Sequence, residues 1–165
     1  MASSVSKDRL LPSLLDRLND NEPRKTEEPR SQRAATMVDL RAAVLRDLEY
    51  LLNTTNLEST IDLSAFPEIR NSVINYGLPS TAGVTPNDVD RDELVKIITD
   101  RIETFEPRIL KNTLKVVTVD DLDSAGQGSV VFEVEGTLWG NPMPESLYFR
   151  TELDLELGEV SVVEV

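Results

Sequence analysis

The spacing of the apolar residues changes once along this chain, and that change constrains the fold more than any other feature. Up to about residue 113, apolar residues recur every three or four positions, which is the spacing of one face of an α-helix. From Leu114 onward they alternate with polar residues, as in a strand that buries one face. Helices followed by strands are typical of an α+β domain. We therefore predict helices followed by a small antiparallel sheet of about four strands.

Three helices are predicted in the first part of this domain. The first covers residues 37–52, and the third covers about residues 91–104, before Pro107. The second covers about residues 67–76, and Gly77 suits the left-handed position that often follows a helix. The second helix is expected to bury four apolar side chains, those of Phe66, Ile69, Val73 and Ile74.

Four segments follow the strand pattern: residues 114–119, 130–138, 147–156 and 160–165. The last segment is rich in valine and contains neither lysine nor proline, the residues that commonly protect an exposed sheet edge. Such an edge can accept a strand from another protein, and the candidate contacts are Val160, Val162 and Val163. Alternatively, the last strand pairs within the domain and its outer edge is covered.

A leucine-rich segment and a polar segment precede this domain, which we place at residues 36–165. The leucines of residues 1–19 fall on one helical stripe and comprise Leu10, Leu11, Leu14, Leu15 and Leu18. Residues 19–33 contain no aliphatic side chain, so we predict a polar linker over residues 20–35. A helix this short is not stable alone and must pack on its own domain or on a partner. The long linker favours a docking helix, with Leu14, Leu15 and Leu18 as its contacts.

The composition argues against several classes of function. The chain contains no histidine and no cysteine, which removes the usual catalytic triads, disulfides and most transition-metal sites. It has no run of 18 apolar residues and no apolar signal segment, so we expect a cytoplasmic protein without membrane insertion. It also has no phosphate-binding glycine loop, and we expect no cofactor. Two of its 30 acidic residues could form the carboxylate pair of a glycosidase. Among so many acidic residues, however, two carboxyl groups at the required separation are expected by chance. We therefore assign no catalytic or metal-binding residue.

The negative charge is concentrated towards the C-terminus. The formal net charge is −13, of which residues 114–165 carry −9, from two basic and eleven acidic side chains. Such a field repels nucleic acid and would steer a basic protein partner towards this part of the chain. The alternative is that the acidity only maintains solubility.

The segment Glu106-Pro107-Arg108 ends the third predicted helix in an unusual way. A glutamate at a helix C-terminus opposes the helix dipole, so Glu106 is expected to have another partner. Arg108 carries a planar guanidinium that suits a carboxylate. Alternatively, the three residues only end the helix and both charges lie in solvent.

Several motifs, in this order, resemble the TssE family, the type VI secretion branch of the phage baseplate wedge proteins. They are Leu14-Leu-Asp-Arg-Leu18, the segment Leu40 to Asn53, Ser72-Val-Ile-Asn-Tyr-Gly-Leu-Pro79 and the segment Ile102 to Arg108. The resemblance covers about residues 36–165, and the third motif is the most specific. The added leucine helix resembles the type VI form more than the shorter phage form. The low basic content of the sheet departs from the family.

The resemblance implies a structural subunit in the cytoplasm and not an enzyme. Its partners would be wedge proteins similar to TssF, TssG and TssK, and sheath proteins similar to TssB and TssC. The domain would resemble the handshake part of sheath proteins and template the first sheath ring. Glu106, Pro107 and Arg108 match a motif that the family uses in subunit contacts. The alternatives are an equivalent protein of a contractile phage tail and, less favoured, a lysozyme-like glycosidase.

Overall fold

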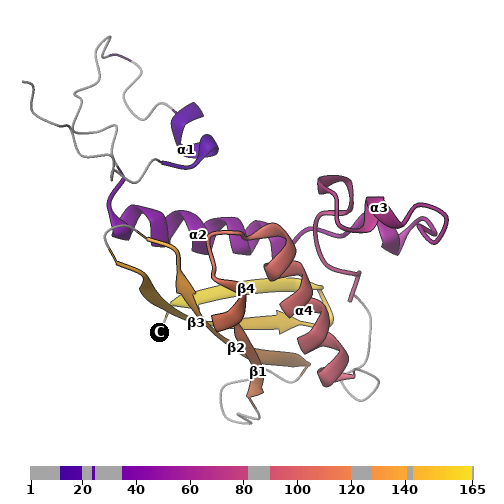
Figure 1. Cartoon of the computed structure of the whole chain (residues 1–165). Coiled ribbons are helices and arrows are strands. Elements are labelled where there is room, and N and C mark those ends of the chain that lie inside the picture. Colours follow the sequence, from indigo (N-terminus) through magenta and orange to yellow (C-terminus); the bar gives the residue numbers. More distant parts are fainter. Residues whose placement is uncertain are drawn as a thin grey trace, which may run out of the picture.

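The domain consists of two helices packed on one face of a four-stranded antiparallel sheet (Figure 1). The computed structural model describes residues 12–19, 24, 35–81, 90–119, 128–140 and 143–164. The main elements are α2 (Met37–Leu52), α4 (Arg91–Phe105), β1 (Lys115–Val119), β2 (Ser129–Leu138), β3 (Glu145–Asp154) and β4 (Glu159–Glu164). The strands are ordered β1-β2-β3-β4. The predicted α+β class, helices first and then four strands, is confirmed.

Both long helices begin at side-chain caps. The Thr36 hydroxyl accepts from the Asp39 N–H at 3.2 Å, and the Asp39 carboxylate accepts from the Thr36 N–H at 2.8 Å. In α4, the Asp90 carboxylate accepts from the Glu93 N–H at 3.0 Å. Such caps satisfy N–H groups that would otherwise lack a partner at the first turn, so the helices start where the sequence places polar residues.

The core lies between the two helices and the inner face of the sheet. In β3 the buried positions alternate with less buried ones, as the period of two requires, and β2 follows the same alternation except at Val131, which is also buried. Phe132 and Phe149 are fully buried, and they belong to one hydrophobic core with Val44 and Leu48 of α2. The opposite face carries polar groups, including the ion pair between Arg150 and Glu133 at 2.6 Å.

Residues 55–78 form a lobe that projects from the end of α2, away from the sheet (Figure 1). It contains η1 (Leu57–Ser59), α3 (Pro67–Arg70) and η2 (Val73–Asn75). A parallel bridge pairs Thr55 with Leu78 and closes the lobe at its base. The Asn56 N–H donates to the Leu78 carbonyl and the Leu78 N–H donates to the Thr54 carbonyl, each at 2.8 Å.

The predicted helix over residues 67–76 is wrong. The helix ends at Arg70, and Ser72 caps a new turn by accepting from the Ile74 N–H at 3.3 Å. The buried residue of that turn is the polar Asn75, and its side chain binds backbone groups. The prediction also placed apolar residues inward, but Phe66, Val73 and Ile74 each expose more than half of their surface.

The N-terminal helix α1 (Leu14–Leu18) has five residues and lies beside α2 (Figure 1). Leu10, Leu11 and most of the predicted linker fall outside the described residues. The exposed fractions of Leu14, Leu15 and Leu18 are 70%, 49% and 75%. Within the described ranges, no helix has the length and apolar character needed to cross a membrane.

Candidate interaction site

The Glu106-Pro107-Arg108 segment is held by backbone bonds on both sides. Before it, the Glu106 N–H closes α4 by donating to the Ile102 carbonyl at 2.9 Å. After it, the Trp139 N–H donates to the Arg108 carbonyl at 2.7 Å, just beyond the end of β2. Pro107 is exposed at the turn between them. The direction of the Arg108 side chain is therefore set by both α4 and the sheet.

The Glu106 side chain is buried, with only 4% of the residue exposed. Its carboxylate accepts from the Arg108 N–H at 3.0 Å and from Arg108 Nε at 2.7 Å, and it forms an ion pair with Arg108 Nη2. A charge with this little solvent needs such partners. Glu106 thus ends its helix against an arginine and not in water.

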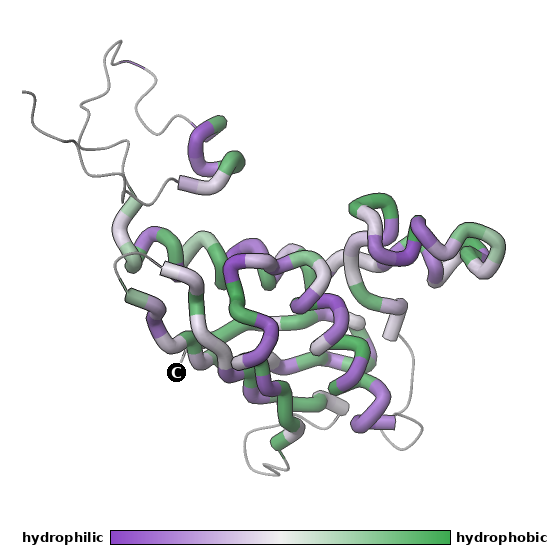
Figure 2. Tube along the Cα trace, viewed as in Figure 1, coloured by the Kyte–Doolittle hydropathy of each residue, from purple (hydrophilic) through white to green (hydrophobic). Residues whose placement is uncertain are grey.

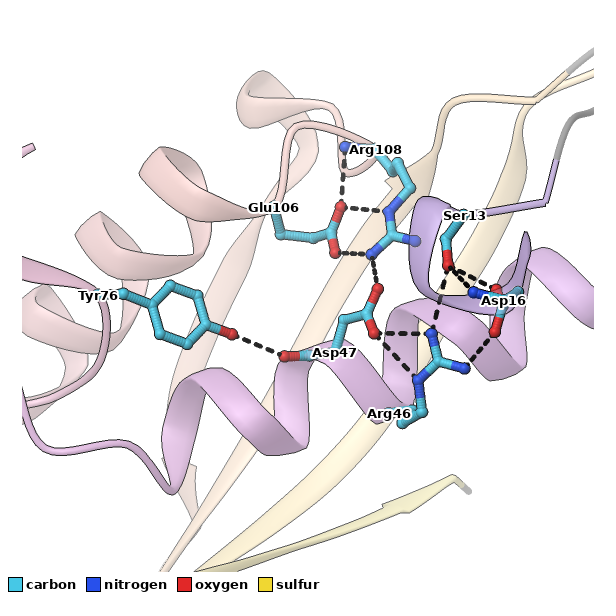
Figure 3. Close-up of polar contacts among 7 residues, drawn as sticks. All are labelled: Ser13, Asp16, Arg46, Asp47, Tyr76, Glu106 and Arg108. Atoms are coloured by element: carbon cyan, nitrogen blue, oxygen red, sulfur yellow. Dashed lines mark hydrogen bonds and ion pairs between the residues drawn. The ribbon is translucent and has the colours of Figure 1, made fainter. Parts of the chain in front are cut away.

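The Glu106–Arg108 pair is the inner end of a row of alternating charges (Figure 3). Arg108 Nη2 lies 2.7 Å from Asp47 Oδ2 in α2, and Asp47 Oδ1 lies 2.9 Å from Arg46 Nη2. Arg46 then forms an ion pair with Asp16 in α1. We call these five residues, Glu106, Arg108, Asp47, Arg46 and Asp16, the charge ladder. The ladder joins the end of α4 to α2 and α2 to α1.

The carboxylates of the ladder stabilise the charged form of Arg108 against the cost of its burial. Burial on its own lowers the pKa of the Arg108 guanidinium, but the hydrogen bonds and charges of Glu106 and Asp47 outweigh it and raise that pKa. The same neighbourhood affects Tyr76, whose hydroxyl donates to the Asp47 carbonyl at 3.3 Å. Burial raises the pKa of Tyr76, and the charges of Asp47 and Glu106 raise it further. The base of the lobe therefore also packs against the ladder.

Two of the three predicted groups of interaction residues are brought together by the ladder. It connects the leucine helix to the Glu106-Pro107-Arg108 segment through Arg46 and Asp47. Sequence reasoning did not find Asp47 as a partner of Arg108, because 61 positions separate the two residues. The only local signal was the placement of two adjacent charges, Arg46 and Asp47, on a helix with an apolar stripe.

The leucine helix is attached to α2 by polar contacts and leaves its leucines uncovered. Ser13 caps the helix, and its hydroxyl donates to Asp16 Oδ2 at 2.6 Å. An open groove of about 360 Å³ lies between the two helices and is lined by Leu15, Asp16, Leu18, Asn19, Arg46 and Tyr50. α1 is therefore positioned by its own domain, while its leucine stripe is free to contact another molecule.

Attachment of α1 is expected to depend on the charge of Asp16. The hydrogen bond from Arg46 lowers the pKa of Asp16 below its usual 3.8. A lowered pKa in the folded state means that the attachment is complete above about pH 3.8 and is lost as the pH falls through the lowered value. Asp16→Asn removes this charge, so it should weaken the attachment of α1 to α2 at neutral pH. The fraction of molecules in which α1 is detached should rise by up to about fivefold.

The methyl NMR signals of Leu15 report this attachment. In the unmodified chain they should shift as the pH falls from 7 to 3, and Arg46→Ala should reproduce the Asp16→Asn spectrum at pH 7. Identical Leu15 signals in the unmodified chain and in both variants at pH 7 would show that the ion pair does not hold α1.

The third predicted group lies on β4, an outer strand of the sheet. Asn53, at the end of α2, already occupies part of this edge. Its amide donates to the Val160 carbonyl at 2.7 Å, and its carbonyl oxygen accepts from the Val160 N–H at 2.8 Å. The Val160 side chain is buried, that of Val162 is half-buried and that of Val163 is exposed. Because strand backbones alternate in direction, Val162 directs its N–H and carbonyl outward, as Val160 does.

In the part of the chain that the structure describes, no three carboxylates are grouped so that they could hold a metal ion.

The family model for baseplate wedge protein gp25 matches residues 38–143. This range includes α2, the lobe, α4, the Glu106-Pro107-Arg108 segment and the first two strands. No significant match was found among curated proteins or among solved structures.

Proposed function

The chain belongs to the family of baseplate wedge protein gp25, and on this premise we propose that it templates the contractile sheath of a type VI secretion system. Members of this family are structural proteins of a baseplate, which gives the chain other baseplate components as partners. In the proposed role, these are wedge proteins similar to TssF, TssG and TssK, and sheath proteins similar to TssB and TssC. The chain would act in the cytoplasm.

The observation that carries the templating role is the outer edge of β4. Asn53 covers this edge at Val160, but Val162 directs its backbone groups outward. An incoming strand would pair with these groups through its own backbone, whatever its side chains. The net charge of −9 over residues 114–165 favours a basic incoming segment and makes its binding dependent on salt.

The type VI assignment is supported by the leucine helix. Leu14 and Leu18 are mostly exposed, although α1 is fixed on α2 by the pair between Asp16 and Arg46. A fixed helix with an uncovered leucine stripe suits a hydrophobic groove on a neighbouring subunit. The alternative within the family is the equivalent subunit of a contractile phage tail.

We propose an assembly role and not catalysis. Among the described residues the buried carboxylate is that of Glu106, and Arg108 binds both of its oxygens, so it is not available as an acid or a base. The chain also lacks histidine and cysteine. A peptidoglycan turbidity assay with the purified full chain should show no activity.

Affinity capture of the full chain from cells that express the whole apparatus tests this function. Wedge and sheath proteins of one type VI system should be recovered together with it. Recovery with phage tail proteins would establish the alternative, and recovery of neither group would contradict the assembly role.

Replacing both Leu14 and Leu15 by aspartate should weaken that recovery without affecting the fold. Because Leu14 is mostly exposed and Leu15 is about half exposed, the melting temperature should change by no more than about 2 °C. Met143→Asp, another exposed apolar position, is the matched control and should leave recovery intact. A large fall in the melting temperature would instead mean that the leucines pack on their own domain.

A further inference from the structure

The lobe contains apolar residues (Figure 2), and several of their side chains are exposed in the described structure. Val73 is 81% exposed and Ile74 is 64% exposed, and Ile61 and Phe66 also expose more than half of their surface. Scattered exposed apolar residues are normal on proteins, but several on one small projection indicate an interaction site. Such a site also requires that the lobe hold these side chains in a defined position.

The base of the lobe is closed by a backbone contact that only glycine permits. Gly77 has a φ of +112°, and a Cβ atom built on it would lie 2.1 Å from the Thr54 carbonyl oxygen. That oxygen accepts the Leu78 N–H at 2.8 Å, so it cannot move away without breaking the bridge. The two ends of the lobe are thus fixed relative to α2.

The interior of the lobe is fixed by buried polar groups. Asn75 is fully buried, accepts from the Glu58 N–H at 2.9 Å and donates to the Arg70 carbonyl at 3.0 Å. Arg101, a buried residue of α4, donates to the same carbonyl at 3.1 Å. These bonds tie the lobe to the main body. In the motif Ser72 to Pro79, Asn75 therefore points inward, and Val73 and Ile74 are held outward.

The charges of the lobe indicate what could cover it. Arg70 is paired with Glu58 at 2.6 Å. Asp62 and Glu68 are exposed and form no ion pair with another described residue, although the charge of Arg70 also acts on Asp62. The uncompensated charge beside the apolar residues is therefore negative. A second copy of this chain, with its own net charge of −13, would be repelled.

We propose that the lobe is a docking surface for another protein, whose binding segment carries apolar residues flanked by lysine or arginine. The apolar residues would cover Val73 and Ile74, and the basic residues would pair with Asp62 and Glu68. This surface is distinct from the β4 edge and from α1, so the proposal stands whether or not β4 templates the sheath.

A photoreactive amino acid at position 73 of the full chain, in cells that assemble the apparatus, tests the proposal. Illumination should crosslink it to another protein, and mass spectrometry should place the crosslink in an apolar segment with lysine or arginine within a few positions. Three results would overturn the proposal. They are crosslinks only to other copies of this chain, crosslinks only to an acidic segment, and a crosslink yield at position 73 no higher than the yield at position 38. Val38 is the matched control position, because it is 76% exposed on α2.

Substitutions in the same chain show whether the contact needs the apolar residue. Adding Ile74→Asp should reduce the crosslink from position 73 by about tenfold or more. The melting temperature should stay within about 2 °C, since Ile74 is exposed. Val38→Asp should leave the crosslink unchanged. An undiminished crosslink in the Ile74→Asp chain would mean that position 73 is near a partner without being part of a docking surface.

Discussion

Replacing Arg108 by alanine is expected to lower the free energy of unfolding by about 3–5 kcal/mol. For a chain of this length, that corresponds to a fall in melting temperature of roughly 6–20 °C. The reason is Glu106, which is almost fully buried and receives three donor groups from Arg108. Two of the three are on the side chain, so alanine leaves a buried carboxylate with a single backbone donor. Thermal and denaturant unfolding of the purified full chain measure the effect.

Arg46→Ala is the matched control for this prediction. It removes an arginine of the same ladder, but its partners Asp47 and Asp16 are partly exposed, and such pairs contribute only about 0–1 kcal/mol. Adding Glu106→Gln to Arg108→Ala should restore part of the lost stability, because the buried charge is then absent. Equal stability of the Arg108→Ala and Arg46→Ala chains would refute the role of the ladder as a brace.

Arg108 therefore has a stabilising role within the domain in addition to the expected role of its segment in subunit contacts. The resemblance to the TssE family implied only a role in subunit contacts for Glu106, Pro107 and Arg108. Since Arg108 also braces the fold, loss of assembly in the Arg108→Ala chain would not separate the two roles. An assembly defect in an Arg108 variant can therefore be assigned to a subunit contact only after the variant is shown to be folded.

Local features of the sequence were sufficient for most of the fold. The bounds of α2 and α4 follow from apolar spacing together with the caps at Thr36 and Asp90. The strands follow from alternation, and the switch between the two periods defines the α+β class. These signals act over a few residues, so they can be seen without knowing the rest of the structure.

The features that failed depend on contacts between distant residues. Ile69, Val73 and Ile74 have helical spacing, but the bridge between Thr55 and Leu78 and the buried Asn75 impose a different path on the chain. The partner of Glu106 lies only two residues away in Arg108, but the second carboxylate bound by Arg108, that of Asp47, is 61 positions away and has no local signal. The interaction of Asn53 with Val160 spans 107 positions, and no local pattern announces it.

The templating role predicts that a single proline in β4 will stop sheath formation. Val162→Pro removes an outward N–H from the free edge, and its ring obstructs an incoming strand, while hydrogen bonds to β3 are made by the neighbouring residues. Val162→Ala is the matched control, because it also shortens the side chain but keeps the N–H. If binding is through the backbone, only the proline should prevent it.

The number of sheaths per cell, counted by fluorescence microscopy with a labelled sheath subunit, measures whether β4 templates the sheath. Circular dichroism must first show that both variants are folded, and affinity capture must show that both still join the wedge. If β4 templates the sheath, we expect nearly normal sheath numbers with Val162→Ala and about tenfold fewer sheaths, or none, with Val162→Pro. Normal sheaths in cells that carry a folded Val162→Pro chain would contradict the claim that β4 templates the sheath.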